Sequence, residues 1–227
     1  MHIFEEWISQ ADQRPAKRPW VSLCYAQSLD GCVTLQRGRP LVLSGAETRR
    51  LTHWLRSKHD AIVVGSGTVL ADNPQLTVRL VEGQSPQPII LDSRLRTPPN
   101  ARLISGHPRP AWIATAEPTD PVHRAALEAA GATLLFLPPD KNGGVALTSL
   151  LDCLAQRGVS RLMVEGGAQV ITSFLASGLV DVLCVTIAPV LLGGLHAVEQ
   201  ALPHPLRLRE VYVETLGGDV VVWGKLD

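Results

Sequence analysis

Several features that would place this chain in a special class of protein are absent. No apolar stretch is long and uninterrupted enough to span a bilayer, and the first 20 residues lack the apolar segment and cleavage site of a secretory signal. Its 21 basic and 21 acidic residues balance, which argues against the basic face of an electrostatic nucleic-acid binder. We therefore expect a cytoplasmic protein that binds a small molecule rather than nucleic acid or membrane.

The patterns of common metal sites are missing as well. The four cysteines show no C-x-x-C pairing, and the seven histidines show no H-E-x-x-H cluster. The zinc-deaminase signature, H-x-E followed by P-C-x-x-C, does not appear either. We expect no disulfide framework and no metal.

What the chain has is an alternation of short apolar runs and helical patterns. The expected strands are residues 20–29, 61–65, 88–92, 111–115, 132–137, 160–167 and 180–189. Helices are expected over 121–131 and 145–158, and a third starts with Ser44 as N-cap and Glu47 completing a capping box. Such alternation predicts an α/β fold with a mainly parallel central sheet and helices on both faces. The strands around Gly217-Gly218 should add an antiparallel C-terminal hairpin.

The first 19 residues form a separate short segment in this interpretation. Ile3, Phe4, Trp7, Ile8 and Ala11 recur at helical spacing, which predicts an amphipathic helix that docks on the body of the protein or on a partner subunit. We therefore divide the chain into a helical extension, residues 1–19, and one domain, residues 20–227.

Three loops follow expected strands, and in parallel sheets ligands bind at the carboxyl ends of strands. The clearest is "EGGAQ", where Gly166 and Gly167 precede a helix. A helix N-terminus has unpaired N–H groups and partial positive charge, and glycine lets a pyrophosphate approach the backbone. The alternative is a tight β–α turn in which glycine serves geometry alone.

The loop "GSGTVLADNPQLTVR" places Gly65, Gly67 and Thr68 in a small-residue turn. It is not the G-x-G-x-x-G fingerprint, so a standard Rossmann site is disfavoured. Asp72, within an expected turn, and Arg79 beyond it suit a polar, phosphorylated ligand, although each has a plain structural alternative.

The third loop, "DSRLR", bears on the choice of cofactor. An acid after such a strand binds the ribose 2′-hydroxyl, whereas serine and arginine suit a 2′-phosphate. Asp92 satisfies the first pattern, and Ser93, Arg94 and Arg96 satisfy the second. The arginines favour NADPH.

Together, "AQSLDG", "GTVLADNPQLTVR", "ILDSRLRTPP", "VEGGAQVITSFL" and "APVLLGG" resemble the pyrimidine reductase of riboflavin biosynthesis. This family comprises the C-terminal half of the bacterial bifunctional deaminase-reductase and similar stand-alone reductases. The resemblance implies a dihydrofolate reductase-like fold with about eight strands, and a homodimer. It also implies that NADPH reduces the ribosylamino group of a phosphoribosylaminopyrimidine to a ribitylamino group.

The resemblance also implies roles for individual residues. The cofactor would be bound by Gly65, Gly67, Thr68, Asp72, Ser93, Arg94, Gly166, Gly167, Ala168 and Gln169. The substrate would be held by Arg56, Leu76, Arg79 and Glu165, with the arginines suited to its phosphate. Glu165 would accept hydrogen bonds from pyrimidine amino groups, the alternative being a favourable charge at a helix N-terminus. Asp30 and Asp72 are the candidates to supply a proton or to hold a water, and for Asp30, in the "SLDG" turn, the alternative is a purely structural role.

Three positions depart from the family pattern. Cys24 stands where many members have lysine, and Pro40 and Val42 stand where many have serine and tryptophan. These departures leave two other hypotheses open: a reductase of the same fold acting on a pterin or another carbonyl or imine, and a nucleotide-binding module without catalysis. Whether the pyrimidine is the deaminated or the diamino compound also stays open.

Overall fold

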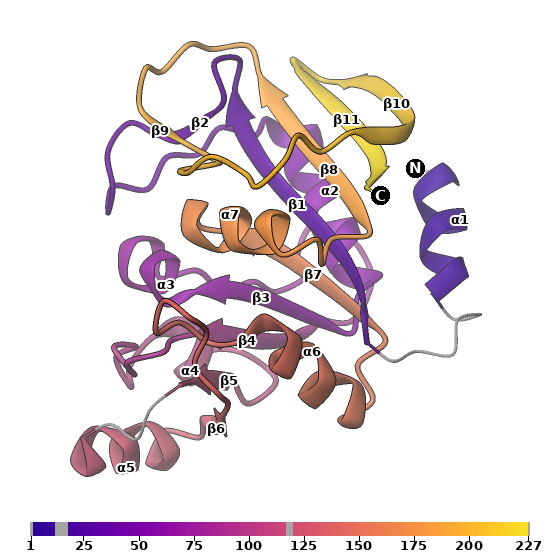
Figure 1. Ribbon diagram of the computed structural model, residues 1–227. Coiled ribbons are helices and arrows are strands. Elements are labelled where there is room, and N and C mark those ends of the chain that lie inside the picture. The colour runs from indigo at the N-terminus through magenta and orange to yellow at the C-terminus, as the bar shows by residue number, and fades with distance from the viewer. Residues whose placement is uncertain (1, 12–17, 117–119, 227) are drawn as a thin grey trace.

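A nine-stranded sheet forms the centre of the molecule in this computed structural model, which describes residues 2–11, 18–116 and 120–226. The order across the sheet is β10-β11-β8-β1-β7-β3-β4-β5-β6 (Figure 1). Its strands are β1 (Trp20–Ser28), β3 (Ala61–Gly65), β4 (Gln87–Leu91), β5 (Trp112–Thr115), β6 (Thr133–Phe136), β7 (Arg161–Gly166), β8 (Val182–Ala188), β10 (Leu208–Leu216) and β11 (Asp219–Leu226). Two short strands, β2 (Cys32–Thr34) and β9 (Leu195–His196), form a separate antiparallel pair.

The expected mixture of parallel and antiparallel strands is confirmed. From β8 through β1, β7, β3, β4 and β5 to β6, every neighbouring pair is parallel. Only β11 runs antiparallel to β8 and to β10, and the hairpin turns at Gly217, where φ is +62°. The sheet thus has nine strands where the resemblance implied about eight.

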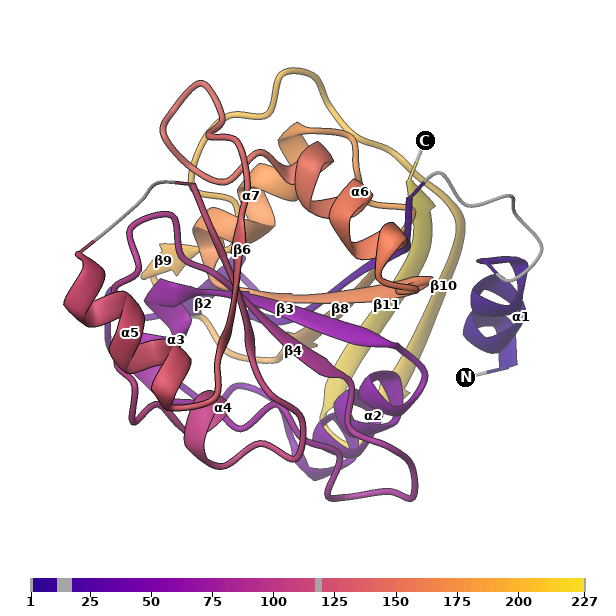
Figure 2. The same ribbon diagram turned by 90° about the horizontal axis from the view of Figure 1, so that it is seen from below.

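Helices cover both faces of the sheet (Figure 2), as expected. They are α1 (His2–Ala11), α2 (Ala46–Ser57), α3 (Ser66–Asp72), α4 (Arg102–Ser105), α5 (Pro121–Ala129), α6 (Leu147–Gln156) and α7 (Ala168–Ala176). Apolar side chains of α1 to α5 join one buried cluster, and those of α6 and α7 join a second. The protein therefore has a core on each side of one sheet, as an α/β layered fold requires. None of the helices in the described residues is long and apolar enough to cross a membrane.

Helix α1 lies on the body of its own chain. Phe4 is fully buried, with its ring centroid 5.0 Å from that of Trp223 in β11, and Trp7 lies 5.8 Å from Tyr212 in β10. Of the predicted extension over residues 1–19, residues 1 and 12–17 lie outside the described residues.

Two local predictions were wrong. Gly45, not Ser44, is the N-cap of α2, and no side chain of the predicted capping box closes the helix. Asp219 does so instead, because its Oδ2 accepts hydrogen bonds from the Gly45 N–H (2.8 Å) and from the Thr48 hydroxyl (2.5 Å). The second error is α3: Ser66–Asp72 is a helix where a turn was expected, because Val69 packs into the core despite the neighbouring glycine.

Candidate functional site

The three loops singled out from the sequence lie next to one another. Strand β3 is hydrogen-bonded to β7 on one side and to β4 on the other, and all three are parallel, so their carboxyl ends share one edge. Arg96 Nη2, in the loop after β4, donates to Ser66 Oγ at the start of α3 (2.9 Å). The side chain of Thr68 reaches the turn after β7, where a Cβ on Gly167 would lie 2.8 Å from Thr68 Oγ1.

The turn between β7 and α7 requires both glycines. Gly166 has φ +121° and Gly167 has φ +52° with ψ 149°, conformations that other residues rarely adopt. Gly167 is the N-cap of α7 and offers no side chain to the first N–H groups of the helix. Ala168 is buried and Gln169 is exposed at this end. Geometry therefore demands glycine here, and the uncapped N–H groups are also what an anion would bind.

Helix α3 contributes two polar side chains to the same edge. Thr68 and Asp72 are four residues apart, so they lie on one face of the helix. Burial raises the pKa of the Asp72 carboxyl above its ordinary value. Gly65 is confined by Val170 of α7, whose Cγ2 would be 2.9 Å from an added Cβ, whereas Gly67 faces open space.

In the loop after β4, the acidic residue is turned inward, and Arg96 Nε lies 3.9 Å from Asp92 Oδ1. Asp92 is buried, and its Oδ2 accepts hydrogen bonds from the backbone N–H and the hydroxyl of Thr97, both at 2.7 Å. This carboxylate is thus committed to its own loop. Ser93 is half-buried and Arg94 is exposed.

Glu165 occupies an irregular position near the end of β7. The pairing of β3 with β7 passes from Val63–Val164 to Val64–Gly166, so Glu165 is the extra residue of a β-bulge. Strand alternation places it on the same face as Met163, which packs in the cluster that includes α2. The acid therefore faces α2, while the glycines that follow turn toward α3.

Arg56 of α2 meets Glu165 in a bidentate ion pair. Its Nε lies 2.6 Å from Oε1 and its Nη2 lies 2.8 Å from Oε2, while Nη1 donates to the Thr77 carbonyl oxygen at 3.0 Å. The two side chains are only 11% and 13% exposed. Burial lowers the pKa of Arg56, but the charge and hydrogen bonds of Glu165 outweigh it and leave that pKa above its ordinary value. Two residues assigned separately to the substrate thus hold each other.

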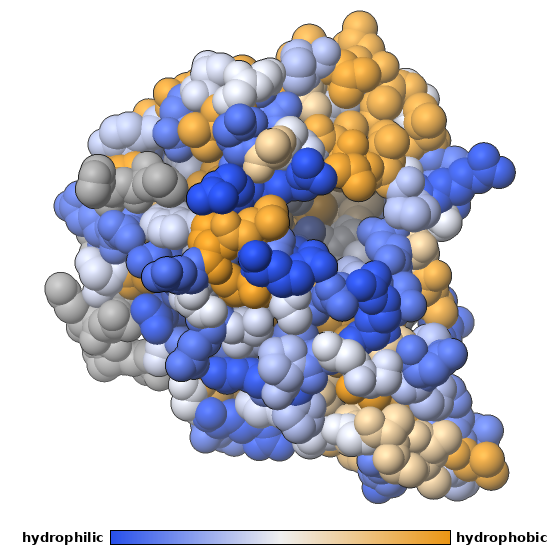
Figure 3. Space-filling model, turned by 180° about the vertical axis from the view of Figure 1, so that it is seen from behind, coloured by the Kyte–Doolittle hydropathy of each residue, from blue (hydrophilic) through white to orange (hydrophobic). Residues whose placement is uncertain are grey.

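A cavity opens beside this ion pair. The back of the molecule is hollowed, with hydrophobic surface along one side of the hollow and hydrophilic surface along the other (Figure 3). The cavity is about 290 Å³ and is lined by Ala26, Val33, Leu41, Val42, Leu43, Ser44, Arg49, Thr52, His53, Arg56 and Arg79. A second cavity of about 170 Å³ shares Ala26, Ser44 and Thr52 with it and reaches Glu165. The ion pair therefore joins two adjoining cavities, because Arg56 lines the first and Glu165 the second.

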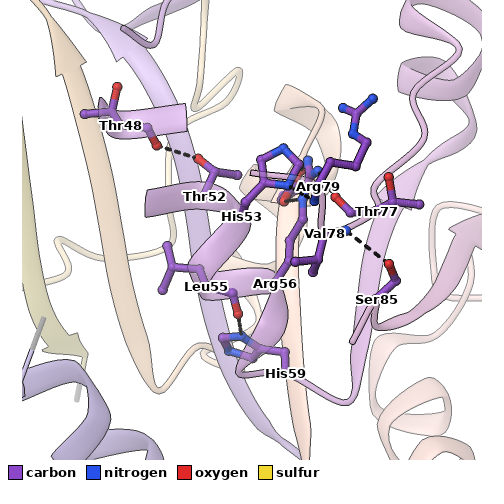
Figure 4. Close-up of polar contacts among 11 residues, drawn as sticks. Thr48, Thr52, His53, Leu55, Arg56, His59, Thr77, Val78, Arg79 and Ser85 are labelled. Carbon is purple, nitrogen blue, oxygen red and sulfur yellow. Dashed lines mark hydrogen bonds and ion pairs between the residues drawn. The ribbon is translucent and has the colours of Figure 1, made fainter. Parts of the chain in front are cut away.

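Most of the polar wall of the larger cavity was not expected from the sequence. Arg49, Thr52 and His53 line the larger cavity with Arg56, at positions i, i+3, i+4 and i+7 of α2. Figure 4 shows Thr52, His53 and Arg56 on this helix. That spacing was visible in the sequence as the face opposite the buried Leu51 and Leu55. A polar stripe on a helix usually faces water, so the spacing alone did not distinguish this wall from a solvated surface.

The segment after α3 brings Leu76 and Arg79 close to α2. Leu76 is 3% exposed and packs in the core with φ +52°, so its side chain is not available to a ligand. Only its backbone can meet a substrate. Arg79 lines the larger cavity, and its guanidinium Nη1 donates to Gln75 Oε1 at 2.5 Å.

Asp30 does not suit the role of proton source that the sequence suggested. Its carboxylate accepts hydrogen bonds from the Ser28 hydroxyl and from the N–H groups of Gly193 (2.7 Å) and Leu192 (3.0 Å). These contacts hold the pKa of Asp30 well below its ordinary value. Asp30 is thus an ionised anchor for the "LLGG" loop.

Two of the three departures from the family pattern line the cavities. Cys24 lies in the smaller cavity beside Cys184, its register partner on β8, and burial together with that neighbour raises its pKa well above the ordinary value. Val42 lines the larger cavity and is 74% exposed, whereas Pro40 is exposed and outside the lining. All four cysteines are free, and no metal-binding cluster of three or more acidic, cysteine or histidine residues occurs in the described part of the chain.

Comparison with known proteins places this site in a family. The model of the RibD C-terminal domain matches residues 19–222. The 2,5-diamino-6-ribosylamino-4(3H)-pyrimidinone 5′-phosphate reductase of Candida glabrata is 34% identical, covering 92% of this chain and 90% of its own length. The enzyme of the same name from Methanothermobacter thermautotrophicus is 37% identical, covering 90% and 97%.

Longer relatives match over part of their length. This chain spans 58% of the riboflavin biosynthesis protein RibD of Aquifex aeolicus, to which it is 33% identical. Among solved structures, the riboflavin biosynthesis reductase Rib7 of Saccharomyces cerevisiae matches 100% of this chain and 98% of its own, with a TM-score of 0.79 and 29% identity. The sequence and the fold are thus those of a known kind of reductase. The chain is a member of the RibD C-terminal domain family of pyrimidine reductases.

Proposed function

We propose that the protein uses NADPH to reduce the ribosylamino side chain of a phosphoribosylaminopyrimidine to a ribitylamino group in riboflavin biosynthesis. One observation carries this proposal: the Arg56–Glu165 pair lies between a cavity lined by cationic side chains and the glycine turn of Gly166 and Gly167. A phosphorylated substrate suits the first region and a pyrophosphate suits the second. Glu165 lies at the boundary between these two regions.

The turn after β7 fits a dinucleotide. Gly167 carries no side chain, which lets the Thr68 hydroxyl lie against the turn, and the first N–H groups of α7 have no side-chain cap. The backbone of residues 166–169 would hold the pyrophosphate, with Thr68 and Asp72 beside it. A bound nicotinamide supplies hydride to the substrate. Because Asp92 is committed to Thr97, Ser93 and Arg94 are left for the adenosine end, which supports NADPH over NADH.

The cavity on α2 suits the substrate. Arg49, Arg56 and Arg79 give it three cationic side chains, which favour a phosphoryl group. Glu165 carries two carboxylate oxygens, each with a lone pair beyond the one that Arg56 uses, so it can still accept from a pyrimidine amino group. The ion pair would then fix the carboxylate at the geometry that orients C1′ of the sugar, an orientation effect.

Reduction at C1′ also consumes one proton. We propose Asp72 as its source, because it shares one face of α3 with Thr68 and partial burial raises its pKa, whereas the contacts of Asp30 lower its pKa. Replacing Asp72 with asparagine should lower turnover and remove an acid-dependent step from the pH profile. The same substitution at Asp30 should act on stability through the "LLGG" loop.

The decisive assay is NADPH oxidation with the diamino-pyrimidinone and the deaminated uracil compound side by side. Relatives of matching length are named for the diamino compound, which supports it as the better substrate here. Dihydrofolate should give no turnover, and NADH should be the poorer reductant. Oxidation with dihydrofolate alone would favour a pterin reductase, and tight NADPH binding without turnover would favour a non-catalytic module.

We further propose that the protein forms a homodimer. Strand β10 forms one edge of the sheet, and Val211 and Val213 on it are 51% and 63% exposed. An exposed edge strand with β-branched side chains is a template for pairing with another chain. Light scattering should give twice the 24.5 kDa chain mass, and a value of one chain mass would contradict the proposal.

A further inference from the structure

His53 has an unusual position on the polar wall of α2. Only 6% of the residue is exposed, yet it lines the larger cavity together with Arg49, Arg56 and Arg79. The backbone N–H of Arg79 donates to His53 Nδ1 at a distance of 2.9 Å. The imidazole therefore sits between α2 and the segment that carries Arg79 (Figure 4).

This contact fixes the tautomer of the ring. A nitrogen that accepts a hydrogen bond carries no proton, so neutral His53 has its proton on Nε2. Burial lowers the pKa of His53 to about 4, and the positive charges of Arg56 and Arg79 act in the same direction while Glu165 opposes them. Within the described residues Nε2 makes no hydrogen bond, so the ring keeps an N–H donor for a ligand of the cavity.

The segment held by His53 is strained and has few other ties to α2. Leu76 has φ +52°, an uncommon conformation for a leucine, and such conformations persist only where neighbouring contacts enforce them. Arg56 Nη1 donates to the Thr77 carbonyl oxygen, and His53 accepts from the Arg79 N–H. The side chains of His53 and Arg56 together fix the position of the backbone from which the Arg79 side chain extends.

We propose that His53 is both a positioning residue and a substrate-binding residue of this site. Its Nδ1 holds the Arg79 N–H and so fixes residues 76–79, and its Nε2–H donates to a phosphoryl oxygen of the substrate. A neutral donor among three arginines adds a directed hydrogen bond where the arginines supply charge. This inference rests on the proposed function, because it assumes a phosphorylated substrate in the larger cavity.

Two substitutions separate the roles of the two ring nitrogens. His53→Asn keeps an acceptor near the place of Nδ1 but has no group at the place of Nε2, whereas His53→Gln extends an amide to the place of Nε2 and loses the acceptor. For His53→Asn we expect KM for the phosphorylated substrate to rise about tenfold, the effect of losing a hydrogen bond to a charged group, with kcat changed less than about twofold. With the dephosphorylated substrate its KM should equal that of the wild type.

His53→Gln should show a different pattern. Its kcat should fall together with a rise in KM, because residues 76–79 are released, and the Arg79 amide should exchange hydrogen faster than in the wild type and in His53→Asn. Equal changes of KM for phosphorylated and dephosphorylated substrates in His53→Asn would overturn the binding role. Unchanged exchange at Arg79 in His53→Gln would overturn the positioning role.

A measurement without turnover keeps this inference apart from the proposed function. In ¹⁵N spectra of the imidazole near neutral pH, Nε2 should be protonated and Nδ1 should not. Ribose 5-phosphate should shift the Nε2 resonance of His53, and ribose should not. If the shift occurs but NADPH oxidation does not, the reductase assignment fails and the role of His53 stands. If ribose 5-phosphate does not shift the Nε2 resonance, the proposed role of His53 is overturned.

Discussion

The site differs on the two sides of Glu165, because one side is formed by backbone groups and the other by side chains. Toward α3 and α7 the site is made of backbone, because Gly166 and Gly167 remove side chains and leave the first turn of α7 uncapped. Toward α2 it is made of side chains, with Arg49, His53 and Arg56 along one helix face. A backbone surface can approach a pyrophosphate closely, whereas a wall of long side chains gives charge and direction to a smaller group.

The two sides of the site should therefore be sensitive to different kinds of substitution. The backbone side is fixed by φ angles and by contacts at Gly65 and Gly167, so it should be sensitive to the addition of a single carbon atom. The α2 side depends on one ion pair and on the placement of the helix, so it should be sensitive to loss of charge.

The largest effect should come from Glu165→Gln. It leaves the Arg56 charge nearly buried and without its partner, which should lower the free energy of unfolding by about 3 kcal/mol. It also releases the group that orients the substrate, so turnover should fall about 100-fold or more. Chemical denaturation and NADPH oxidation measure the two effects.

Two further variants tell stability from function at this pair. In Arg56→Met/Glu165→Gln no unpaired charge remains, so stability should largely return while turnover stays low. Glu128→Gln breaks an exposed pair with Arg124 and should change stability by less than about 0.5 kcal/mol. Full turnover in Glu165→Gln would refute the role assigned to this acid.

Gly167→Ala tests the backbone side. The φ of +52° with ψ of 149° should cost about 1–3 kcal/mol, and the new Cβ should press on Thr68, raising KM for NADPH more than KM for the pyrimidine. Adding Thr68→Ala removes the collision but not the strain, so it should restore stability only in part.

Gly65→Ala should behave differently, because Gly65 has an ordinary φ of −81°. The loss of stability in Gly65→Ala should be restored by Val170→Ala, which removes the side chain that the new Cβ would meet.

A smaller effect is expected at the N-terminus of α2. Asp219→Ala removes the acceptor for Gly45 N–H and for the Thr48 hydroxyl, which should lower the free energy of unfolding by about 1–2 kcal/mol. The matched control is Ser44→Ala, the substitution at the N-cap that the sequence suggested, which should leave stability nearly unchanged. Equal losses in both variants would show that the hairpin does not cap this helix.

The smallest effect concerns pH and the histidines of the α2 region. Burial is the main cause that lowers the pKa of His59 to about 4, and its ring bridges the Leu55 carbonyl and the Ser22 hydroxyl at 2.7 and 2.8 Å. Unfolded histidine titrates near 6.5, so the unfolded state binds more protons below that pH and stability falls. From pH 7 to about 5.5 we expect a loss of about 1 kcal/mol for this residue, and the loss should shrink in His59→Asn. A denaturation midpoint that does not change between pH 7 and about 5.5 would contradict this prediction.

The same contrast explains how much the sequence could predict. Glycine turns and the acid before them are local patterns, so both were found, as were the parallel strands and the hairpin at Gly217. The Arg56–Glu165 pair joins residues 109 positions apart, and neither stretch of sequence indicates that its residue pairs with the other. Each was therefore assigned to the substrate alone.

Other errors have the same origin. Asp219 caps a helix that begins 173 residues earlier, and such a contact depends on where the hairpin packs. Leu76 belongs to a family motif, but only the structure shows its side chain turned into the core. The sequence left Asp30 open between a proton source and a structural role, and the N–H groups of Leu192 and Gly193 that bind it favour the structural role.

In the proposed site, Glu165 lies between a cofactor side formed by backbone groups and a substrate side formed by side chains. A crystal structure with NADP⁺ and the phosphorylated pyrimidine bound together tests it most directly. We predict the diphosphate at the N–H groups of residues 167–169 and the substrate phosphoryl group among Arg49, His53 and Arg79. A diphosphate lying against α2, or a substrate phosphoryl group at the glycine turn, would contradict the account.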